Sequence, residues 1–142
     1  DAMKTLEVEA TKQSLKELTE LFETVLEEHG CPAGMQMQFD IAFEELFVNI
    51  VNYAYQDGKG NVRVTYDIGK EGEQRSLNIS LEDCGTPYNP LSKADPDITL
   101  SAEERKIGGL GVFMAKKFLD SIRYEWKEGY NCISFEKKWK VA

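Results

Sequence analysis

Histidine and cysteine are scarce in this sequence. Its 142 residues contain one histidine, His29, and three cysteines, Cys31, Cys84 and Cys132, with no Cys-x-x-Cys pair. These side chains are too few and too scattered to supply the ligands of a zinc site. A single histidine also disfavours catalysis by a Ser-His-Asp or Cys-His arrangement. We expect His29 to be a surface side chain beside the free, reduced thiol of Cys31.

Positive charge and long apolar runs are also lacking. Lys and Arg number 17 against 25 Asp and Glu, a net charge of −8. An acidic chain repels a phosphate backbone, which argues against generic nucleic-acid binding. No run reaches the roughly 18 apolar residues of a membrane span, and the start of the chain has no apolar signal region. We therefore expect a cytoplasmic protein without membrane attachment, folded as one domain over residues 1–142.

Apolar periodicity predicts both strands and helices along the chain. It predicts strands at 6–10, 62–68, 77–83, 122–126 and 133–139, helices at 11–28, 35–55 and 112–119, and a long loop at 84–109. This order favours an α+β fold, a two-layer sandwich in which helices cover one face of a mixed, mostly antiparallel sheet. The helix at 35–55 is apolar on nearly every face, so we expect it to lie deep in the domain.

Three polar residues interrupt that apolar helix. Glu45, Asn49 and Asn52 fall within an arc of about 60° at roughly 3.6 residues per turn. Because a buried carboxylate or amide costs free energy unless a polar group meets it, this stripe must face a backbone, a water network or a ligand. The helix alone favours a structural hydrogen-bond network over a ligand site.

Two short motifs bound the long loop. Asp-Cys-Gly-Thr-Pro at 83–87 ends a predicted strand, where a carboxylate can accept a hydrogen bond from a ligand amine; the same residues also form an ordinary turn. Gly-Gly-Leu-Gly at 108–111 opens the next predicted helix. Converging N–H groups at a helix N-terminus suit a phosphate, although a glycine-rich turn is more often a hinge. Arg105 and Lys106 add local positive charge just before it.

These segments stand in an order that resembles a known superfamily. The segments 45–54, 83–87 and 108–111 are similar to the three nucleotide-binding motifs of the Bergerat fold, which gyrase, histidine kinases, mismatch-repair proteins and certain chaperones share. The segments 87–91, 104–111 and 118–120 resemble those of bacterial anti-sigma-factor serine/threonine kinases, a single-domain branch of these histidine-kinase-like (GHKL) ATPases. The resemblance covers nearly the whole chain.

The resemblance implies roles for the motif residues. Asp83 would bind the exocyclic amine of adenine, with Gly85 giving the ring room. Asn49 would coordinate Mg²⁺, and Glu45 would be the general base for a seryl or threonyl hydroxyl. Residues from about 88 to 107 would form a lid over the phosphates of ATP. The expected nucleotide-binding set is Asn49, Tyr53, Asp83, Gly85, Pro87, Arg105, Gly108, Gly109, Leu110 and Gly111.

The chain departs from the family pattern at two places. Tyr53 stands where relatives often carry histidine in the first motif. The threonine that many relatives place on a late strand to contact the nucleotide has no clear counterpart, and we expect Cys132 or Ser134 in its neighbourhood. The first departure leaves a hydroxyl that can still donate a hydrogen bond but does not titrate near neutral pH.

The resemblance implies an ATP- and Mg²⁺-dependent serine/threonine kinase that regulates transcription. Such a protein phosphorylates a small anti-anti-sigma protein of the STAS type and, in its other state, sequesters a sigma factor, so that phosphorylation switches partners. A homodimer is a further expectation from the family. An alternative is a nucleotide-gated binding module that transfers no phosphate, because fold and cofactor do not fix function. A detached ATPase domain of a chaperone or topoisomerase relative is a third alternative.

Overall fold

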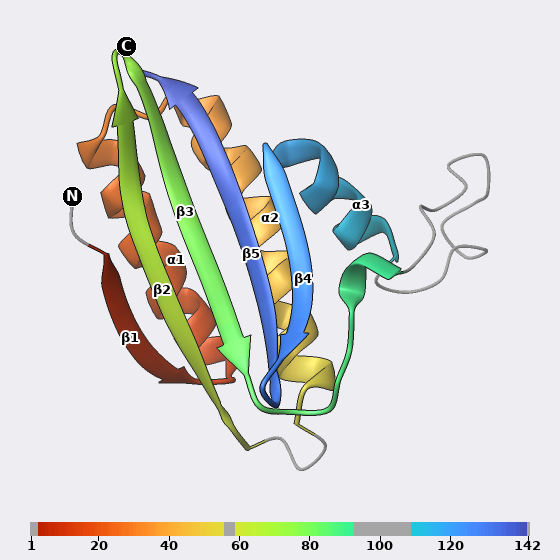
Figure 1. The fold of residues 1–142 in the computed structure, drawn as a ribbon. Helices are drawn as coiled ribbons and strands as arrows, with labels where there is room; N and C mark the ends of the chain where they lie inside the picture. Colours follow the sequence, from red (N-terminus) through yellow and green to blue (C-terminus); the bar gives the residue numbers. More distant parts are fainter. Residues whose placement is uncertain (1–2, 56–58, 93–108, 142) are drawn as a thin grey trace.

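The sheet has five strands, each antiparallel to its neighbours. The computed structural model describes residues 3–55, 59–92 and 109–141. Within them the strands lie in the order β1-β2-β3-β5-β4 (Figure 1). They are β1 (Lys4–Glu9), β2 (Asn61–Glu71), β3 (Gln74–Asp83), β4 (Ser121–Lys127) and β5 (Tyr130–Lys140). The sheet that we expected to be mixed is therefore antiparallel throughout the described residues.

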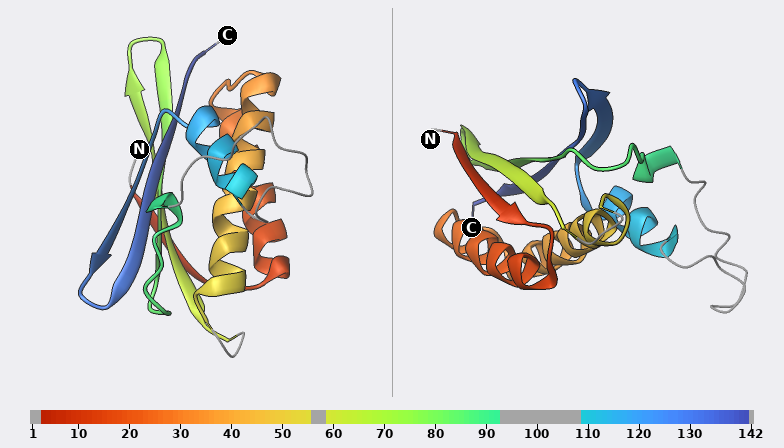
Figure 2. Two further views of the ribbon diagram at one scale, coloured as in Figure 1. Left: turned by 90° about the vertical axis from the view of Figure 1, so that its right-hand side faces the viewer. Right: turned by 90° about the horizontal axis from the view of Figure 1, so that it is seen from below.

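The helices of the described residues cover one face of this sheet. They are α1 (Lys12–Glu28), α2 (Ala33–Tyr53) and α3 (Gly109–Phe118), together with a short 3-10 helix, η1 (Pro90–Ser92). Figure 2 shows the sheet and the α-helices as two separate layers. The predicted α+β two-layer sandwich is therefore confirmed. In the part of the chain that the structure describes, no helix is long and apolar enough to cross a membrane.

The helix ends follow local signals in the sequence. Thr11 caps α1, because its side chain accepts a hydrogen bond from the Ser14 N–H at 3.1 Å. Gly30 ends α1 with a φ of 71°, a left-handed conformation that glycine adopts without strain. Pro32 is the N-cap of α2, which therefore begins before the predicted position 35.

The core lies between the two layers and centres on α2. Alternate residues of β2, β3 and β5 are buried, as expected for strands with one covered face. Phe22 of α1 meets Phe43 of α2 and Tyr66 of β2 edge to face, with ring centroids 5.2 Å apart in both pairs. Because α2 packs against both α1 and α3, the prediction that it lies deep in the domain is confirmed.

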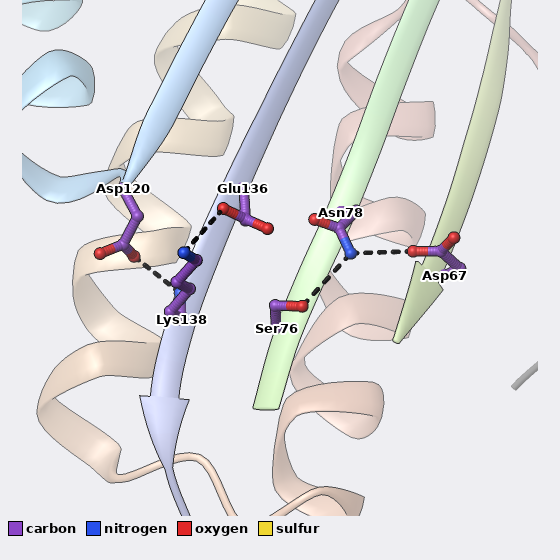
Figure 3. Close-up of polar contacts among 6 residues, drawn as sticks. All are labelled: Asp67, Ser76, Asn78, Asp120, Glu136 and Lys138. Atoms are coloured by element: carbon purple, nitrogen blue, oxygen red, sulfur yellow. Dashed lines mark hydrogen bonds and ion pairs between the residues drawn. The ribbon is translucent and has the colours of Figure 1, made fainter. Parts of the chain in front are cut away.

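The opposite face of the sheet is polar. Asn78 donates to Asp67 Oδ1 at 2.9 Å, and the Lys138 ammonium lies 3.7 Å from the Glu136 carboxylate. Both contacts are drawn in Figure 3. A hollow of about 370 Å³ on this face is lined by Ser134 but, among the described residues, by none of the expected nucleotide-binding set. The described members of that set belong instead to α2, α3 and the end of β3 with the loop that follows it.

Elements that carry predicted site residues meet at one end of the molecule. At the lower end in Figure 1, α2 and β3 end and β5 begins. Asp83, the last residue of β3, pairs with Asn131, near the start of β5. Sheet pairing therefore places the second motif beside the C-terminal end of α2.

Candidate active site

Asp83 is a buried carboxylate whose two oxygens have different surroundings. Oδ1 accepts hydrogen bonds from the Gly85 N–H at 3.0 Å and from Asn131 Nδ2 at 2.8 Å. Oδ2 has no donor among the described residues. Burial raises the pKa of Asp83, and the two donors on Oδ1 act against that rise. One oxygen therefore fixes the side chain, and the other is left for a ligand.

Asn131 organises this end of the site. Its side chain is buried and uses its full hydrogen-bonding capacity. Nδ2 donates to Asp83 and to the Thr86 carbonyl at 3.0 Å. Oδ1 accepts from the Tyr88 N–H at 3.0 Å and from the Tyr124 hydroxyl. One side chain thus joins the carboxylate, the loop after it and strand β4.

Asn131 is not among the residues that we predicted from the sequence. We expected Cys132 or Ser134 near the nucleotide, but both belong to the other face of β5: Ser134 Oγ lies 2.9 Å from Ser80 Oγ beside the hollow on the uncovered face. Asn131 lies instead on the same face of β5 as the buried Ile133, two positions further along the strand. An asparagine in phase with buried apolar residues was the signal that could have identified it.

Gly85 allows close packing between the second motif and α2. A Cβ at this position would lie 2.0 Å from the carbonyl oxygen of Ala54, the C-cap residue of α2. The Thr86 N–H donates to the same oxygen at 2.7 Å. This contact requires a glycine whether or not a ligand is bound, so the predicted role of Gly85 in accommodating a base remains a prediction.

Tyr55 fixes the other side of this junction. Its hydroxyl donates to the Asn61 carbonyl at 2.6 Å and accepts from the Cys84 N–H at 3.1 Å. Burial raises the pKa of Tyr55 to about 12, so the hydroxyl stays protonated and can make both bonds. The end of α2, the start of β2 and the second motif are therefore tied together.

A small cavity lies beside Asp83. Its volume is about 30 Å³, which is room for about one water molecule. Its walls come from α2, β3, β4, β5 and the loop after β3: Leu46, Asn49, Ile50, Ala54, Leu81, Asp83, Tyr88, Pro90, Tyr124, Asn131 and Ile133. A purine base is larger than this cavity. Base binding therefore requires part of the wall to move, and the segment from Tyr88 to Pro90 is the part outside the sheet and α2.

Tyr53 and Pro87, two predicted nucleotide contacts, lie around that segment. The Tyr53 ring packs on the Tyr88 ring with centroids 5.3 Å apart. Pro87 is exposed, and neither Tyr53 nor Pro87 lines the cavity. Their contacts with nucleotide remain predictions, and the Tyr53 ring supports Tyr88 in this structure.

Glu45 and Asn49 lie one turn apart on α2. Asn49 is buried and lines the cavity, and its Nδ2 donates to the Glu45 carbonyl at 2.9 Å. Glu45 is partly buried, and burial together with the neighbouring charge of Glu44 raises its pKa. Asn52 is exposed, so the predicted polar stripe runs from the core out to solvent.

The third motif is described in part. Gly109, Leu110 and Gly111 form the first turn of α3, so the predicted helix start at this motif is confirmed. The N–H groups of such a turn have no partner within the helix and suit an anion. Arg105 and Gly108, and residues 93–107 of the predicted lid, lie outside the described residues.

Asn49 fits the role of a magnesium ligand. Its Nδ2 is used by the helix, and its Oδ1 has no donor among the described residues. Those residues contain no group of three or more His, Cys, Asp or Glu side chains that could hold a metal ion. Magnesium needs few protein ligands where nucleotide phosphates and water complete its coordination, so one amide oxygen suffices.

His29 is partly exposed and Cys31 is buried. The His29 ring nitrogen Nδ1 lies 2.8 Å from the Val25 carbonyl, and Trp139 Nε1 donates to the His29 carbonyl at 2.9 Å. Cys31 is a free thiol, as predicted, but it is buried, and burial raises its pKa to about 11. His29 therefore lies at the surface in part, and the C-terminal strand packs over the backbone of this turn.

The two-layer α+β fold agrees with that of a nucleotide-binding domain of the ATPase type. Comparison with known families gives the same class: the chain belongs to the family described as the histidine kinase-like ATPase domain, whose model matches residues 8–137.

Curated relatives within this family are protein kinases. The chain is 20% identical over 130 residues to the serine/threonine-protein kinase BtrW of Bordetella bronchiseptica, a match that covers 92% of this chain and 89% of that protein. It is 26% identical over 98 residues to the serine-protein kinase RsbW of Listeria monocytogenes, covering 66% of this chain and 60% of the relative. The predicted resemblance to the serine/threonine-kinase branch of these ATPases is thereby confirmed.

A solved structure has the same fold. The RsbU and RsbW domains of a Mycobacterium tuberculosis protein match with a TM-score of 0.66 at 15% identity, covering 99% of this chain and 34% of that one. At 15% identity the match shows only that the fold is shared. The chain thus spans about a third of that protein and 60% of the Listeria kinase.

Proposed function

We propose that this chain is an ATP- and Mg²⁺-dependent kinase that phosphorylates a serine or threonine of a partner protein. The observation that carries the proposal is that Asn49 and Asp83 line one cavity, so the polar turn of α2 and the carboxylate at the end of β3 face a common space. Asp83 Oδ2 is available to accept from the amine of adenine. Membership of an ATPase family over residues 8–137 supports ATP as the nucleotide.

Glu45 is the proposed general base. Its raised pKa makes it a stronger base toward a seryl or threonyl hydroxyl than an ordinary exposed glutamate. It precedes by one turn Asn49, which would hold a magnesium ion; such an ion would supply positive charge beside the transferred phosphate. Glu45 takes the hydroxyl proton while Asp83 and Asn49 hold the nucleotide.

The remaining predicted contacts belong to the phosphate side of the site. We assign the N–H groups of the first turn of α3 to the phosphates. Arg105 and Gly108 complete the predicted set from the proposed lid, and Tyr53 and Pro87 complete it from the loops near Asp83. This group supplies binding and closure rather than proton transfer.

The proposed partners are those of a partner-switching pathway. The phosphate acceptor is a small anti-anti-sigma protein of the STAS type, and a sigma factor is sequestered in the other state. Relatives named as serine-protein kinases support a protein substrate. The net charge of −8 is consistent with regulation of transcription through protein partners instead of direct contact with nucleic acid. A homodimer and a cytoplasmic location are part of the same proposal.

Transfer of labelled phosphate to an anti-anti-sigma protein from the same genome tests the kinase proposal. Glu45→Gln is expected to slow transfer by about 10²- to 10⁴-fold. ATP binding should be unchanged, since Glu45 does not line the cavity. Glu44→Gln is the matched control, because Glu44 is the exposed neighbour on the same helix; its transfer at neutral pH should stay close to that of the unaltered chain. Full-rate transfer by Glu45→Gln would refute the mechanism.

A second candidate function is a nucleotide-gated binding module without phosphate transfer. The observation that favours it is that Asn131 connects Asp83 to Thr86 and Tyr88, so binding at the carboxylate can move the segment that follows. Tight ATP binding with no labelled phosphate on any anti-anti-sigma protein would select this function. Labelled phosphate on such a protein would exclude it.

A further inference from the structure

Asn131 stands between the carboxylate that we assign to base recognition and the loop after it. Its Nδ2 lies 2.8 Å from Asp83 Oδ1. Since its two donors and its acceptor oxygen are all engaged within the protein, the side chain has no hydrogen bond left for a ligand. Any influence of Asn131 on a bound nucleotide therefore acts through Asp83 or through the loop.

We propose that Asn131 is a positioning residue that sets nucleobase specificity, by holding Asp83 as a hydrogen-bond acceptor so that the site takes a 6-aminopurine and rejects a 6-oxopurine. The inference rests on the proposed function, because it takes Asp83 as the partner of the base. It goes beyond that function by naming the group that fixes the choice of base.

The choice of base depends on the protonation state of Asp83. An ionised carboxylate only accepts hydrogen bonds, whereas a protonated one also donates. Adenine offers an N–H donor at position 6, and hypoxanthine and guanine offer a carbonyl acceptor there. Asp83 is 3% exposed, and such burial favours the protonated form. The hydrogen bonds from Asn131 and Gly85 to Oδ1 favour the ionised form and so favour the amine.

Other titratable groups around Asp83 do not supply this control. The cavity walls contain the hydroxyls of Tyr88 and Tyr124, and the Tyr55 hydroxyl and the Cys84 thiol lie at the junction behind. Burial raises the pKa of Tyr55 to about 12 and also raises the pKa of Tyr124. In the described residues no second carboxylate and no cation lines the cavity. The balance between burial and the two donors on Oδ1 therefore sets the protonation state of Asp83.

The test compares binding of ATP and inosine triphosphate, which differ at position 6 of the purine and in the hydrogen that the 6-oxopurine carries on N1. Dissociation constants are measured by calorimetry with magnesium for the unaltered chain, Asn131→Ala and Asn131→Asp, between about pH 5.5 and 7.5. The readout is the ratio of the two constants, because titration of the phosphates and loosening of the loop affect both nucleotides alike.

The unaltered chain should prefer ATP by roughly 10- to 150-fold, with a ratio that varies less over this range than the ratio of the variants. In Asn131→Ala the ratio should be smaller at the acid end and grow as pH rises, because loss of the Asn131 donor raises the pKa of Asp83 further. Asn131→Asp keeps the size of the side chain, so it serves where the alanine variant fails to fold. It should also make the ratio pH-dependent, because two adjacent carboxyls raise one of their pKa values.

Asn78→Ala is the matched control. Asn78 donates to Asp67 Oδ1 at 2.9 Å on the uncovered face, a second Asn–Asp pair remote from the cavity (Figure 3). Its removal should leave both dissociation constants and their ratio unchanged.

Two results would overturn the inference alone. One is a flat ratio in folded Asn131 variants equal to that of the unaltered chain, even if both nucleotides bind more weakly. The other is equal binding of the two nucleotides by the unaltered chain. If the unaltered chain binds neither nucleotide, the proposed function fails as well.

Discussion

The two ends of the candidate site differ in how completely their polar groups are paired within the protein. At the base end, formed by Asp83, Gly85 and Asn131, hydrogen bonds hold the carboxylate, the loop and the strand together. At the catalytic end, formed by Glu45 and Asn49, the Glu45 carboxylate and Asn49 Oδ1 have no partner among the described residues. The pairing of β3 with β5 brings Asp83 and Asn131 together at the base end, whereas Glu45 and Asn49 of the catalytic end both lie on α2.

This difference separates the effects that substitutions should have. A preformed base end loses little entropy on binding, so changes there should alter affinity and, where packing is involved, stability. Glu45 and Asn49 acquire their proposed partners only from the nucleotide, the ion and the acceptor. Changes there should alter turnover with little effect on folding. The predictions below test this separation.

Asp83→Asn should have the largest effect on binding. It keeps the size of the side chain but removes the charge that accepts from the adenine amine. ATP affinity should fall by roughly 10- to 150-fold, the range for a hydrogen bond to a charged group. Calorimetry measures the loss. Asp67→Asn is the control, because Asp67 also accepts a hydrogen bond from an asparagine amide but lies on the uncovered face. Equal affinities for the two variants would remove Asp83 from the site.

Gly85→Ala should destabilise the fold by about 1–3 kcal/mol, because the new Cβ meets the Ala54 carbonyl oxygen at 2.0 Å and the backbone must shift. Thermal unfolding measures the change. Gly34→Ala is the matched control: no atom lies within 4 Å of its added Cβ, and alanine suits the first turn of α2. If both variants unfold at the same temperature, the base end is not fixed by this contact.

Lys137→Met should have a smaller effect on stability. It should loosen the attachment of α3 to α2, the helix that carries the catalytic end. Lys137 is buried, and its ammonium donates to the Phe118 carbonyl at the end of α3 at 2.7 Å and to Gln38 Oε1 of α2 at 2.8 Å. Losing these bonds, offset by relief from burying a charge, should cost about 1 kcal/mol in urea unfolding. The exposed neighbour Lys138, replaced by Met, should change stability by less than about 0.5 kcal/mol. Should both variants be equally stable, Lys137 does not anchor α3.

Local patterns predicted the fold well, and long-range pairing explains what they missed. In the described residues, alternation and helical spacing located the five strands and three α-helices, because each of these elements follows its own periodicity, whereas η1 lies in the predicted loop. Asn131 was missed since its importance arises from the register between β3 and β5, which brings it to Asp83. The packing of Gly85 on Ala54 and of Trp139 on His29 likewise joins distant segments. Sequence motifs identified Asp83 and Asn49. The structure identified Asn131, which donates a hydrogen bond to Asp83.

The smallest predicted effect concerns pH and belongs to the catalytic end. A general base must be ionised, so phosphate transfer should be lost as pH falls through the pKa of Glu45, which burial and the charge of Glu44 raise. Glu44→Gln removes that charge and should lower the pKa, so the acid limb of kcat/KM moves to lower pH while the plateau is kept. Glu28→Gln, an exposed change at the end of α1, should leave the limb in place. ATP affinity of Glu44→Gln should follow the unaltered chain throughout, because the base end holds Asp83 through bonds that Glu44 does not touch. If the acid limb of kcat/KM does not move in Glu44→Gln, a group other than Glu45 accepts the proton.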